Sequence, residues 1–332
     1  MRSAVIGVGN MGWNHARVYN ELEGVDLVAV ADLDGRIVER AAHVYGARGY
    51  TDYREMLRHE EIDAVSIAVP TQIHRETTLA ALQRGCHILV EKPIAFTIEE
   101  GQEMVALAAS RGLKLAVGHI ERFNPAIVEL KRRLRRREAG QIFQIHARRL
   151  GPFPNRVRDV GVVIDLATHD LDIMRYLLDS EVKRIYAETE HGIHTEHEDL
   201  LSGLLRFENG VIGLLSINWL TPTKIRELTV TGERGMFLVN YLTQDLYFYE
   251  NDYVDSQWGS LGLLRGVGEG NMIRLKIEKR EPLRVEIEAF VKAVLEDGEP
   301  AVRGEDGLTA LALAQRLVES GQENKLVILG ER

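Results

Sequence analysis

Residues 4–12 read Ala-Val-Ile-Gly-Val-Gly-Asn-Met-Gly, a short apolar strand that runs into Gly7, Gly9 and Gly12. The first glycine of such a pattern permits a tight turn, and the second lets the backbone approach a pyrophosphate. The third lets the following helix pack closely on the strand, and the N-terminus of that helix attracts phosphate charge. Glycines cluster in many loops, so the spacing alone is a weak signal, but here a helical stretch follows at residues 11–22. The pattern therefore predicts a dinucleotide-binding turn.

A second apolar strand, residues 27–31, ends at Asp32. This acid lies at about the distance from the glycines that is expected of the residue binding the adenosine ribose. A carboxylate there accepts hydrogen bonds from a 2′-hydroxyl and repels a 2′-phosphate, so NAD is favoured over NADP as the cofactor. Two interpretations of Arg36 stay open: a cation that softens this preference, and an ordinary exposed helix residue.

Residues 87–93 read as a buried strand that finishes in Glu91, Lys92 and Pro93. The interior of a parallel strand is apolar because helices cover both faces of the sheet. A lysine at the end of such a strand points into the crevice at the carboxyl edge, where ligands of open α/β folds bind. A solvated strand end would explain a lone lysine, but the glycines locate the same crevice independently. We therefore treat Lys92 as a site residue.

Strands and helices alternate over the first third of the chain, which predicts a right-handed doubly wound parallel sheet, a Rossmann domain over residues 1–119. The pattern then changes to alternating strands, predicted at residues 142–149, 183–190, 199–207, 211–219, 225–232 and 236–241. Asn209-Gly210 is a strong hairpin signal between two of them. Residues 120–332 are therefore expected to form an α+β domain with a large, mainly antiparallel open sheet. Helices near residues 283–295 and 307–320 are expected to cover one face of it.

Composition limits the class of protein. The 332 residues allow two domains, and 45% hydrophobic with 27% charged residues is ordinary for a soluble globular chain. A net charge of −9 argues against non-specific nucleic-acid binding, which needs a basic surface. The single cysteine, Cys86, excludes an intrachain disulfide, and we expect neither a signal peptide nor a membrane-spanning run. We expect a cytoplasmic protein with no membrane partner.

A third motif lies between the first two strands of the second sheet, at residues 159–174. Asp165 and His169 are four residues apart, so on a helix they share one face, one turn apart. A histidine beside a carboxylate is the usual apparatus for taking a proton from an alcohol near neutral pH. A helix with a surface aspartate and histidine would show the same spacing, and the spacing alone leaves that alternative open.

The glycine pattern, Glu91-Lys92-Pro93 and Gly161-x-x-x-Asp165-x-x-x-His169 together resemble the Gfo/Idh/MocA oxidoreductases, in that family's order and over essentially the whole chain. The resemblance implies catalytic roles for Lys92, Asp165 and His169 and a cis peptide bond before Pro93. It also implies NAD-dependent oxidation of a sugar hydroxyl. The residues expected to contact the cofactor are Gly7, Gly9, Asn10, Met11, Asp32, Val69, Pro70, Thr71, His74, Glu91 and Lys92.

Within that family, residues 118–125, 151–169 and 218–222 resemble archaeal-type enzymes that oxidise C3 of UDP-N-acetylglucosamine. A nucleotide-sugar diphosphate needs cations, and arginines cluster just before the catalytic helix. Each of them has the alternative of an ordinary surface residue or a subunit contact. The clustered arginines are Arg148, Arg149, Arg156 and Arg158. The residues expected to bind the substrate are Lys92, Arg122, Asn124, Arg156, Asp165 and His169.

A histidine-rich segment invites a metal interpretation, but it lacks the regular ligand spacing of a zinc site. We expect a solvated hairpin tip there and no metal. The segment contains His191, His194, His197, Glu196, Glu198 and Asp199. The predicted second sheet also has too few helices to cover both faces, and an exposed apolar face is normally buried by a partner. We therefore expect a homodimer or a homotetramer formed through the C-terminal sheet.

Three alternative functions stay open. A dehydrogenase of a free sugar or cyclitol would not need the arginines. An NAD-dependent glycosidase would use transient oxidation at C3 to expel an anomeric group. A non-catalytic dinucleotide-binding regulator would have no reason to retain Lys92 together with Asp165 and His169.

Overall fold

The computed structural model describes residues 1–154, 160–193, 196–254 and 266–330, and the chain divides into two compact units. The first unit consists of Met1–Phe123 and Glu281–Ala312, and the second of Asn124–Arg280 and Leu313–Arg332. The chain therefore leaves the first unit close to the boundary expected at residue 119. It returns to that unit at residue 281, a return that the expectation of one continuous second domain left out.

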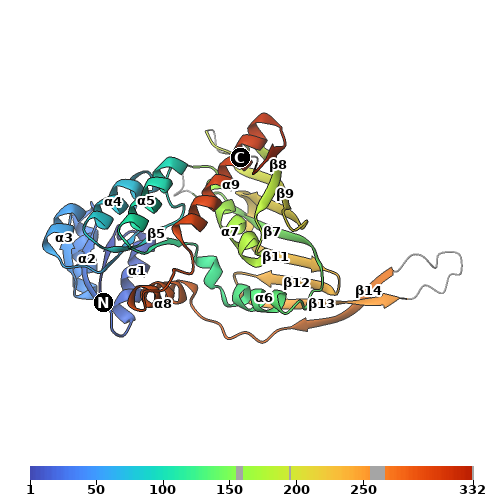
Figure 1. Cartoon of the computed structure of the whole chain (residues 1–332), viewed down its shortest axis with the longest axis horizontal. Helices are drawn as coiled ribbons and strands as arrows, with labels where there is room; N and C mark the ends of the chain where they lie inside the picture. Colours follow the sequence, from blue (N-terminus) through green and yellow to red (C-terminus); the bar gives the residue numbers. More distant parts are fainter. Residues whose placement is uncertain (155–159, 194–195, 255–265, 331–332) are drawn as a thin grey trace, which may run out of the picture. The chain divides into compact units, whose positions relative to one another are not determined.

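Every residue of the first unit is described, and its centre is a parallel sheet of six strands. The strand order is β3-β2-β1-β4-β5-β6, so the order reverses between β1 and β4, and the predicted doubly wound sheet is confirmed. The strands are β1 (Arg2–Ile6), β2 (Asp26–Ala31), β3 (Arg48–Tyr50), β4 (Ala64–Ile67), β5 (His87–Glu91) and β6 (Leu115–Gly118). The elements between and after them are α1 (Asn10–Glu21), α2 (Gly35–Tyr45), α3 (Tyr53–His59), η1 (Thr71–Ile73), α4 (His74–Gln83), α5 (Ile98–Ser110) and η2 (Ile120–Phe123), seen in blue to green in Figure 1.

The sequence specifies where these helices begin and end. At the start of α5, Thr97 Oγ1 accepts the N–H of Glu100 at 3.2 Å, and the Glu100 carboxylate accepts the N–H of Thr97 at 3.4 Å. This reciprocal pair satisfies N–H groups that have no partner within the helix. Helix α2 begins after Asp34, which accepts the N–H of Arg36, and ends at Gly46 in the left-handed conformation. The central strands are largely buried: every residue of β4 is buried.

Helix α8 (Pro282–Leu295) belongs to the first unit, where Leu283, Ile287 and Phe290 join Val18 and Tyr19 of α1 in one buried cluster. Burial of each large side chain contributes about 1.5–3 kcal/mol. The sequence analysis placed this helix on the large sheet of the second unit, and that prediction was wrong. An amphipathic pattern shows that one face of a helix is buried, but it does not show which surface buries it.

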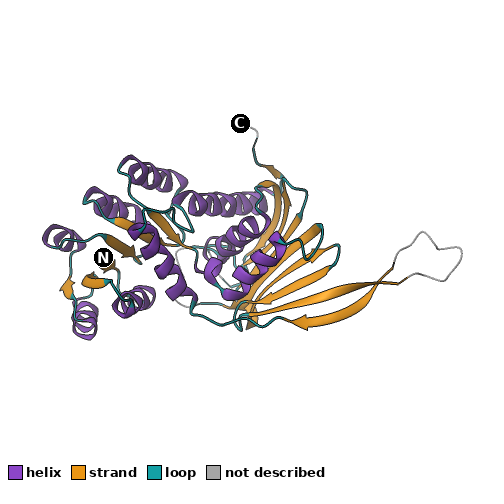
Figure 2. Ribbon diagram, turned by 60° about the horizontal axis from the view of Figure 1, so that its bottom comes forward, coloured by secondary structure: helices purple, strands orange, loops and turns teal. Residues whose placement is uncertain are grey.

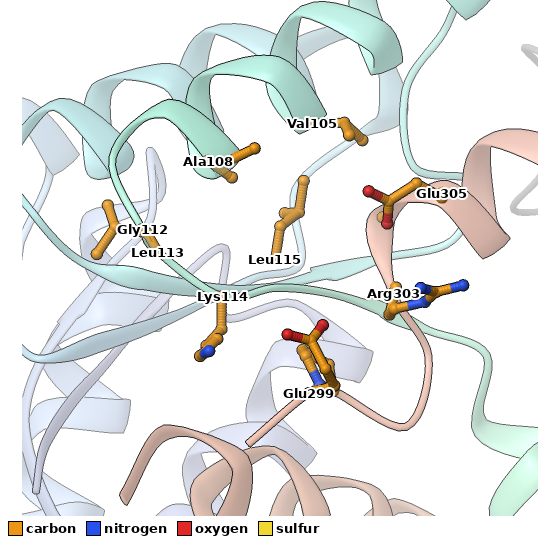
Figure 3. Close-up of a pocket in the computed structure, with 12 residues that line it drawn as sticks. Val105, Ala108, Gly112, Leu113, Lys114, Leu115, Glu299, Arg303 and Glu305 are labelled. Atoms are coloured by element: carbon orange, nitrogen blue, oxygen red, sulfur yellow. The ribbon is translucent and has the colours of Figure 1, made fainter. Parts of the chain in front are cut away.

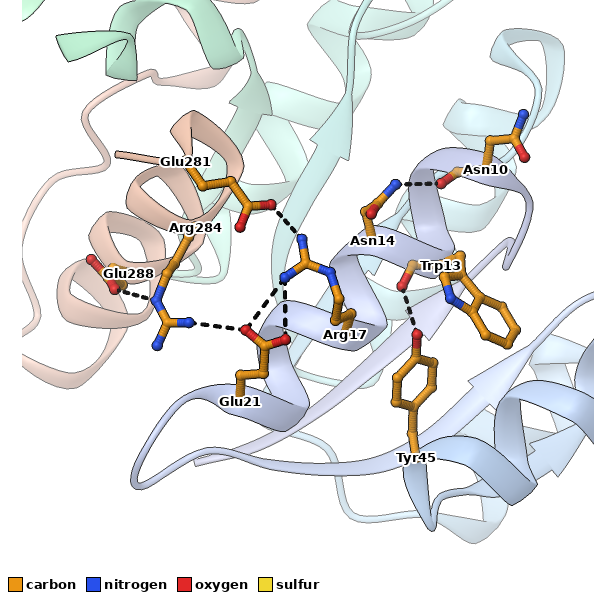
Figure 4. Close-up of polar contacts among 9 residues, drawn as sticks. All are labelled: Asn10, Trp13, Asn14, Arg17, Glu21, Tyr45, Glu281, Arg284 and Glu288. Atoms are coloured by element: carbon orange, nitrogen blue, oxygen red, sulfur yellow. Dashed lines mark hydrogen bonds and ion pairs between the residues drawn. The ribbon is translucent and has the colours of Figure 1, made fainter. Parts of the chain in front are cut away.

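Ion pairs follow the exposed edge of the contact between α1 and α8 (Figure 4). Arg17 of α1 binds both Glu21 and Glu281, and Arg284 of α8 binds both Glu21 and Glu288. Single exposed pairs contribute little to stability, but here five side chains form one network between α1 and the start of α8. The network fixes how α8 is placed along α1.

The second unit contains a sheet of nine strands among its described residues, in the order β14-β13-β12-β11-β7-β10-β9-β8-β15. Only β7 and β10 of the paired neighbours in these residues run parallel, so the mainly antiparallel sheet is confirmed. Three strands were not predicted: β13, β14 and β15. The strands are β7 (Ile142–Pro152), β8 (Val182–Glu190), β9 (Leu200–Phe207), β10 (Ile212–Asn218), β11 (Leu220–Gly232), β12 (Gly235–Asn240), β13 (Asp245–Val254), β14 (Gly266–Arg274) and β15 (Val327–Ile328).

Helices cover one face of this sheet, as Figure 2 shows. They are α6 (Pro125–Arg135), α7 (Thr168–Leu178) with the short segment η3 (Val163–Ala167) before it, and the second half of α9 (Gly304–Glu323). Leu130, Met174 and Leu317 represent the three helices in the buried cluster against the strands. The prediction for the last helix is confirmed for this half. None of the described helices is both long enough and apolar enough to cross a membrane.

The first unit contains a buried acid, Glu286, that the sequence analysis did not identify. Glu286 of α8 is 2% exposed, and neither of its carboxyl oxygens has a hydrogen-bond partner among the described residues. Burial, together with the negative charge of Glu91, raises the pKa of Glu286 well above its usual value. Glu286 therefore keeps its proton at pH values where an exposed glutamate is ionised.

We expect Glu286→Gln to stabilise the protein by an amount that grows with pH. A group with a raised folded-state pKa contributes its full stability below the unfolded-state pKa, and that contribution is lost as pH rises through the folded-state pKa. The amide does not ionise, so the difference in unfolding free energy should grow by about 1.4 kcal/mol per pH unit across that window. Urea unfolding at several pH values measures it, with Glu288→Gln on the same helix as the control. A difference that does not change with pH would contradict a neutral Glu286.

Candidate active site

The turn between β1 and α1 has the three features that the glycine spacing predicted. Gly7 has a φ of +86°, and a Cβ added there would lie 2.6 Å from the carbonyl oxygen of Ala68. A Cβ on Gly12 would lie 1.7 Å from the carbonyl oxygen of Gly7, so α1 packs against the turn itself. Gly9, at the N-cap of α1, has open space where its side chain would be. The N–H groups of the first helical turn are thus placed to bind a phosphate.

Asp32 is tied to this turn. Its Oδ2 accepts the N–H of Val8 at 2.8 Å, and its Oδ1 accepts the N–H of Asp34 at 3.0 Å. A carboxylate has about four acceptor positions, so two remain for ribose hydroxyls. The residues present therefore fit the adenosine half of a dinucleotide.

The loops after β4 and β5 are joined by His74, which is buried. Its Nδ1 lies 2.9 Å from the carbonyl oxygen of Pro93, and its Nε2 lies 3.0 Å from that of Val69. The peptide bond between Lys92 and Pro93 is cis, as the resemblance implied. Lys92 itself follows the last residue of β5, at the carboxyl edge of the sheet.

Glu91 points into the fold, toward helix α1. Its Oε1 lies 2.9 Å from Nε2 of His15, whose Nδ1 lies 3.0 Å from the hydroxyl of Ser66. Burial alone would raise the pKa of Glu91, but the hydrogen bond and charge of His15, with help from Lys92, hold that pKa below its usual value. Glu91 is therefore an internal carboxylate at neutral pH, directly before Lys92 in the chain.

The carboxyl edge of the first sheet thus brings together the turns that carry the expected cofactor residues. These turns follow β1, β2, β4 and β5, and the residues are Gly7, Gly9, Asn10, Met11, Asp32, Val69, Pro70, Thr71, His74, Glu91 and Lys92. Contact of each with a cofactor stays a prediction.

Two expected substrate residues have internal partners. Arg122 is buried and donates to the carbonyl oxygen of Ala301 at 3.0 Å. Asn124 accepts the N–H of Ala126 at the start of α6 and donates to the carbonyl oxygen of Tyr241 at 3.1 Å. Binding of substrate by either residue stays a prediction.

Asp165 and His169 lie in one helical segment of the second unit, but that segment is not a uniform α-helix. Residues Val163–Ala167 form a π-helical turn, and α7 begins at Thr168. Asp165 is buried and His169 is half-buried. A π turn is rare and is frequently found at functional sites. The sequence analysis found the two side chains and their helix, but their spacing gave no sign of the wider turn.

Glu198, in the chain just before β9, holds the start of this segment. Its Oε1 accepts the N–H of Val163 at 3.1 Å, and its carbonyl oxygen accepts the N–H of Val162 at 2.9 Å. A Cβ on Gly161 would lie 2.1 Å from Oε1 of Glu198, so this carboxylate occupies the space of a side chain. An acid at this end also suits the helix dipole.

The expectation of a solvated hairpin tip was wrong for part of the histidine-rich segment. Glu198 and Asp199 are both buried, and Asp199 Oδ1 accepts the N–H of Gly192 at 2.8 Å. Conversely, His191 is exposed, and His194 lies outside the described residues. In the described part of the chain, no three potential metal ligands gather into a group.

The four arginines predicted to cluster do not share one environment in the structure. Arg148 forms an ion pair with Glu227, at 3.0 Å. Arg149 is buried and binds Asp170 of α7 through two hydrogen bonds, so it is not an ordinary surface arginine, and its charge already has a carboxylate partner. Arg156 and Arg158 lie outside the described residues.

A separate cavity of about 250 Å³ lies in the first unit, among the end of α5, the start of β6 and the first residues of α9 (Figure 3). Val105, Ala108 and Leu115 form its apolar side, and Glu299 and Glu305 carry carboxylates around it. It lies at the start of β6, whereas the expected cofactor residues follow the ends of the strands. The cavity is therefore not part of the dinucleotide site.

Two family models match this chain, one within each unit. Residues 1–119 match the oxidoreductase family with an NAD-binding Rossmann fold, GFO_IDH_MocA, and residues 127–238 match the Gfo/Idh/MocA C-terminal domain. UDP-N-acetylglucosamine 3-dehydrogenase of Acidithiobacillus ferrooxidans is 30% identical over 294 residues, which cover 89% of this chain and 88% of that protein. A solved structure of that enzyme has a TM-score of 0.84 at 28% identity, covering 97% of this chain and 98% of the other.

Other relatives act on different polyols. Myo-inositol 2-dehydrogenase of Thermotoga maritima is 25% identical over 343 aligned positions, which cover 100% of this chain and 99% of that protein. A levoglucosan dehydrogenase solved with NADH and L-sorbose has a TM-score of 0.85 at 22% identity, covering 100% of this chain and 99% of the other. At that identity the likeness shows the fold alone.

We expect Gly161→Ala to destabilise the start of the segment that carries Asp165 and His169. The added methyl group needs the space of the Glu198 carboxylate, which would have to release the N–H of Val163. Loss of such a cap costs about 0.5–2 kcal/mol in unfolding free energy. Glu198→Ala removes the same cap, so the double variant should lose little more than either single variant in urea unfolding. Fully additive losses would show that the two residues act independently.

Proposed function

Because this chain belongs to the Gfo/Idh/MocA oxidoreductases, we propose that it is an NAD-dependent dehydrogenase that oxidises C3 of UDP-N-acetylglucosamine to the 3-keto sugar. The observation that carries the proposal is the helical segment with Asp165 and His169, in a chain whose other unit carries Lys92 and the glycine turn at the carboxyl edge of one parallel sheet. Similarity to a UDP-N-acetylglucosamine 3-dehydrogenase over most of the chain supports the choice of substrate.

The residues have distinct roles in this proposal. His169 takes the proton of the substrate hydroxyl, and Asp165 orients the substrate and the charged groups. The ammonium group of Lys92 bonds the reacting oxygen and stabilises its developing negative charge. Gly7, Gly9 and Asp32 hold the cofactor, which supplies the hydride acceptor when bound.

A second candidate is a dehydrogenase of a free cyclitol. The burial of Arg149 favours it, because one of the four cations expected for a diphosphate is bound to Asp170 instead. Inositol dehydrogenases are also among the relatives. NADH formation followed by absorbance with UDP-N-acetylglucosamine and with myo-inositol separates the two. Activity with myo-inositol alone would contradict the nucleotide-sugar proposal.

We also propose a homodimer or a homotetramer formed through the face of the second sheet that lacks helices in the described chain. Leu201, Gly203 and Leu205 of β9 face the helix-covered core, so Leu204 points to the other side, where it is 47% exposed. An apolar residue there supports burial by a second copy of the chain.

We expect Asp32→Ala to weaken NAD binding and to relax discrimination against NADP. Loss of a charged acceptor for the ribose hydroxyls costs about 1.5–3 kcal/mol, which is roughly a ten- to hundredfold rise in KM for NAD. Asp32→Asn is the matched control, because its amide oxygen can still accept the N–H of Val8. It should remove the repulsion of a 2′-phosphate with a smaller loss for NAD. Steady-state kinetics with both cofactors measure this, and a wild type that prefers NADP would overturn it.

We expect Lys92→Met and His169→Ala to lower turnover roughly hundred- to ten-thousandfold while NAD affinity stays nearly unchanged. Asp165→Asn should lower turnover less, since orientation is its role. Wild-type activity should fall as pH drops through the range in which histidines become protonated, because a protonated base accepts no proton. Turnover and cofactor titrations at several pH values measure these effects. Near-normal turnover in His169→Ala with the active sugar would disprove the mechanism.

A further inference from the structure

The residue after His169 takes part in a buried ion pair. Asp170 accepts one hydrogen bond from Arg149 Nε at 2.7 Å and another from Nη2 at 3.0 Å. The side chains are 6% exposed for Arg149 and 1% for Asp170. The ring of Tyr241 lies over the guanidinium, 5.3 Å from its centre. All three residues belong to the second unit.

Stability alone does not account for this pair. Removing two charges from water costs several kcal/mol, and well-packed apolar residues in the same place are often equally or more stabilising. What apolar residues do not supply is direction. Two parallel hydrogen bonds between a planar guanidinium and a carboxylate fix their mutual orientation, whereas apolar contacts tolerate sliding and rotation.

The direction matters because of where Asp170 lies. It is in the first turn of α7, about 100° around the helix from His169. Arg149 is on β7, within the sheet that α7 packs against. Fixing the Asp170 carboxylate against the sheet therefore fixes the rotation of this turn about its axis, and with it the direction in which His169 leaves the helix.

The π-helical turn makes such an anchor necessary. Asp165 lies within this turn and His169 lies two residues after it, and π turns are rarer than α turns. Relaxation to α-helical geometry would rotate one of these side chains relative to the other. Glu198 holds Val163, the first residue of the π turn, and the Arg149–Asp170 pair holds the first turn of α7, which follows the π turn.

We propose that Arg149 and Asp170 are positioning residues for His169, and that their ion pair keeps the π turn and the first turn of α7 in the rotation that catalysis needs. The proposal rests on the proposed function, in which His169 takes the substrate proton. Neither residue touches the substrate in it. Their effect passes through the orientation of the helix.

The decisive variant is Arg149→Met combined with Asp170→Leu, which replaces the pair with apolar side chains of similar length. We expect it to fold with a melting temperature near that of the wild type, but with kcat lowered roughly ten- to hundredfold, as for a displaced catalytic group. KM for NAD should not change, because the expected cofactor residues belong to the first unit. The matched control is Arg175→Met with Glu181→Leu, which removes another two-bonded arginine–carboxylate pair involving α7, away from His169.

A second measurement does not depend on activity. With isotope-labelled histidine, the imidazole resonances of His169, assigned with His169→Ala, should shift or broaden in the apolar double variant and stay unchanged in the control. If the double variant does not fold, Arg149→Lys keeps the charge but loses the two-bonded geometry, and it should show the same effects. Wild-type kcat and unchanged His169 resonances in the variant that folds would overturn the proposal. Absence of any wild-type dehydrogenase activity would overturn the proposed function instead, and the resonances would still decide the positioning role.

Discussion

The first unit depends on one close approach of backbone to backbone, at the turn between β1 and α1. The carbonyl oxygen of Gly7 occupies the space that a side chain at Gly12 would need, so α1 lies directly against the end of the sheet. Because α1 packs this closely on the sheet, the ring of His15 lies within hydrogen-bond distance of Ser66 and Glu91. Because Glu91 is held by His15, the backbone of the next residue, Lys92, is also held in place. Two glycines at the start of the chain therefore determine where a lysine eighty residues later is placed.

The second unit holds the helical segment that carries Asp165 and His169 through charged side chains. Glu198 accepts an N–H at the beginning of the segment, Asp170 binds Arg149 in the first turn of α7, and Lys131 donates to the carbonyl oxygen of Leu177 near its end. The order of the signs follows the helix dipole, with an acid at the start and a cation at the end. Apolar packing supplies most of the stability of this helix, and these charges supply its direction.

The sequence predicts well whatever depends on local pattern. The six parallel strands, the glycine turn and the helix of Asp165 and His169 each follow from spacing and alternation. The position of α8 did not, because its apolar face fits either unit, and β14 was missed because glycines at 266, 268 and 270 disfavour a strand that only pairing with β13 stabilises. The role of Arg149 was predictable in principle. On β7 it shares the buried face with Ile145 and Ala147, so alternation already excluded it from solvent.

The same reasoning applies to Asp170, the partner of Arg149. It also shows why this ion pair could not be predicted from one element alone. Asp170 stands three, four and seven residues before Ile173, Met174 and Leu177, on the apolar stripe of α7. A charge on an apolar stripe is unfavourable unless a second charge meets it, and a charge on the core face of β7 has the same need. A buried charge on β7 therefore predicts a buried charge of opposite sign on another element, and the same holds for α7. Only the packing of α7 on the sheet shows that Arg149 and Asp170 meet. Charged residues that interrupt an apolar pattern in two elements are thus informative together, since burial makes their pairing obligatory and their geometry specific.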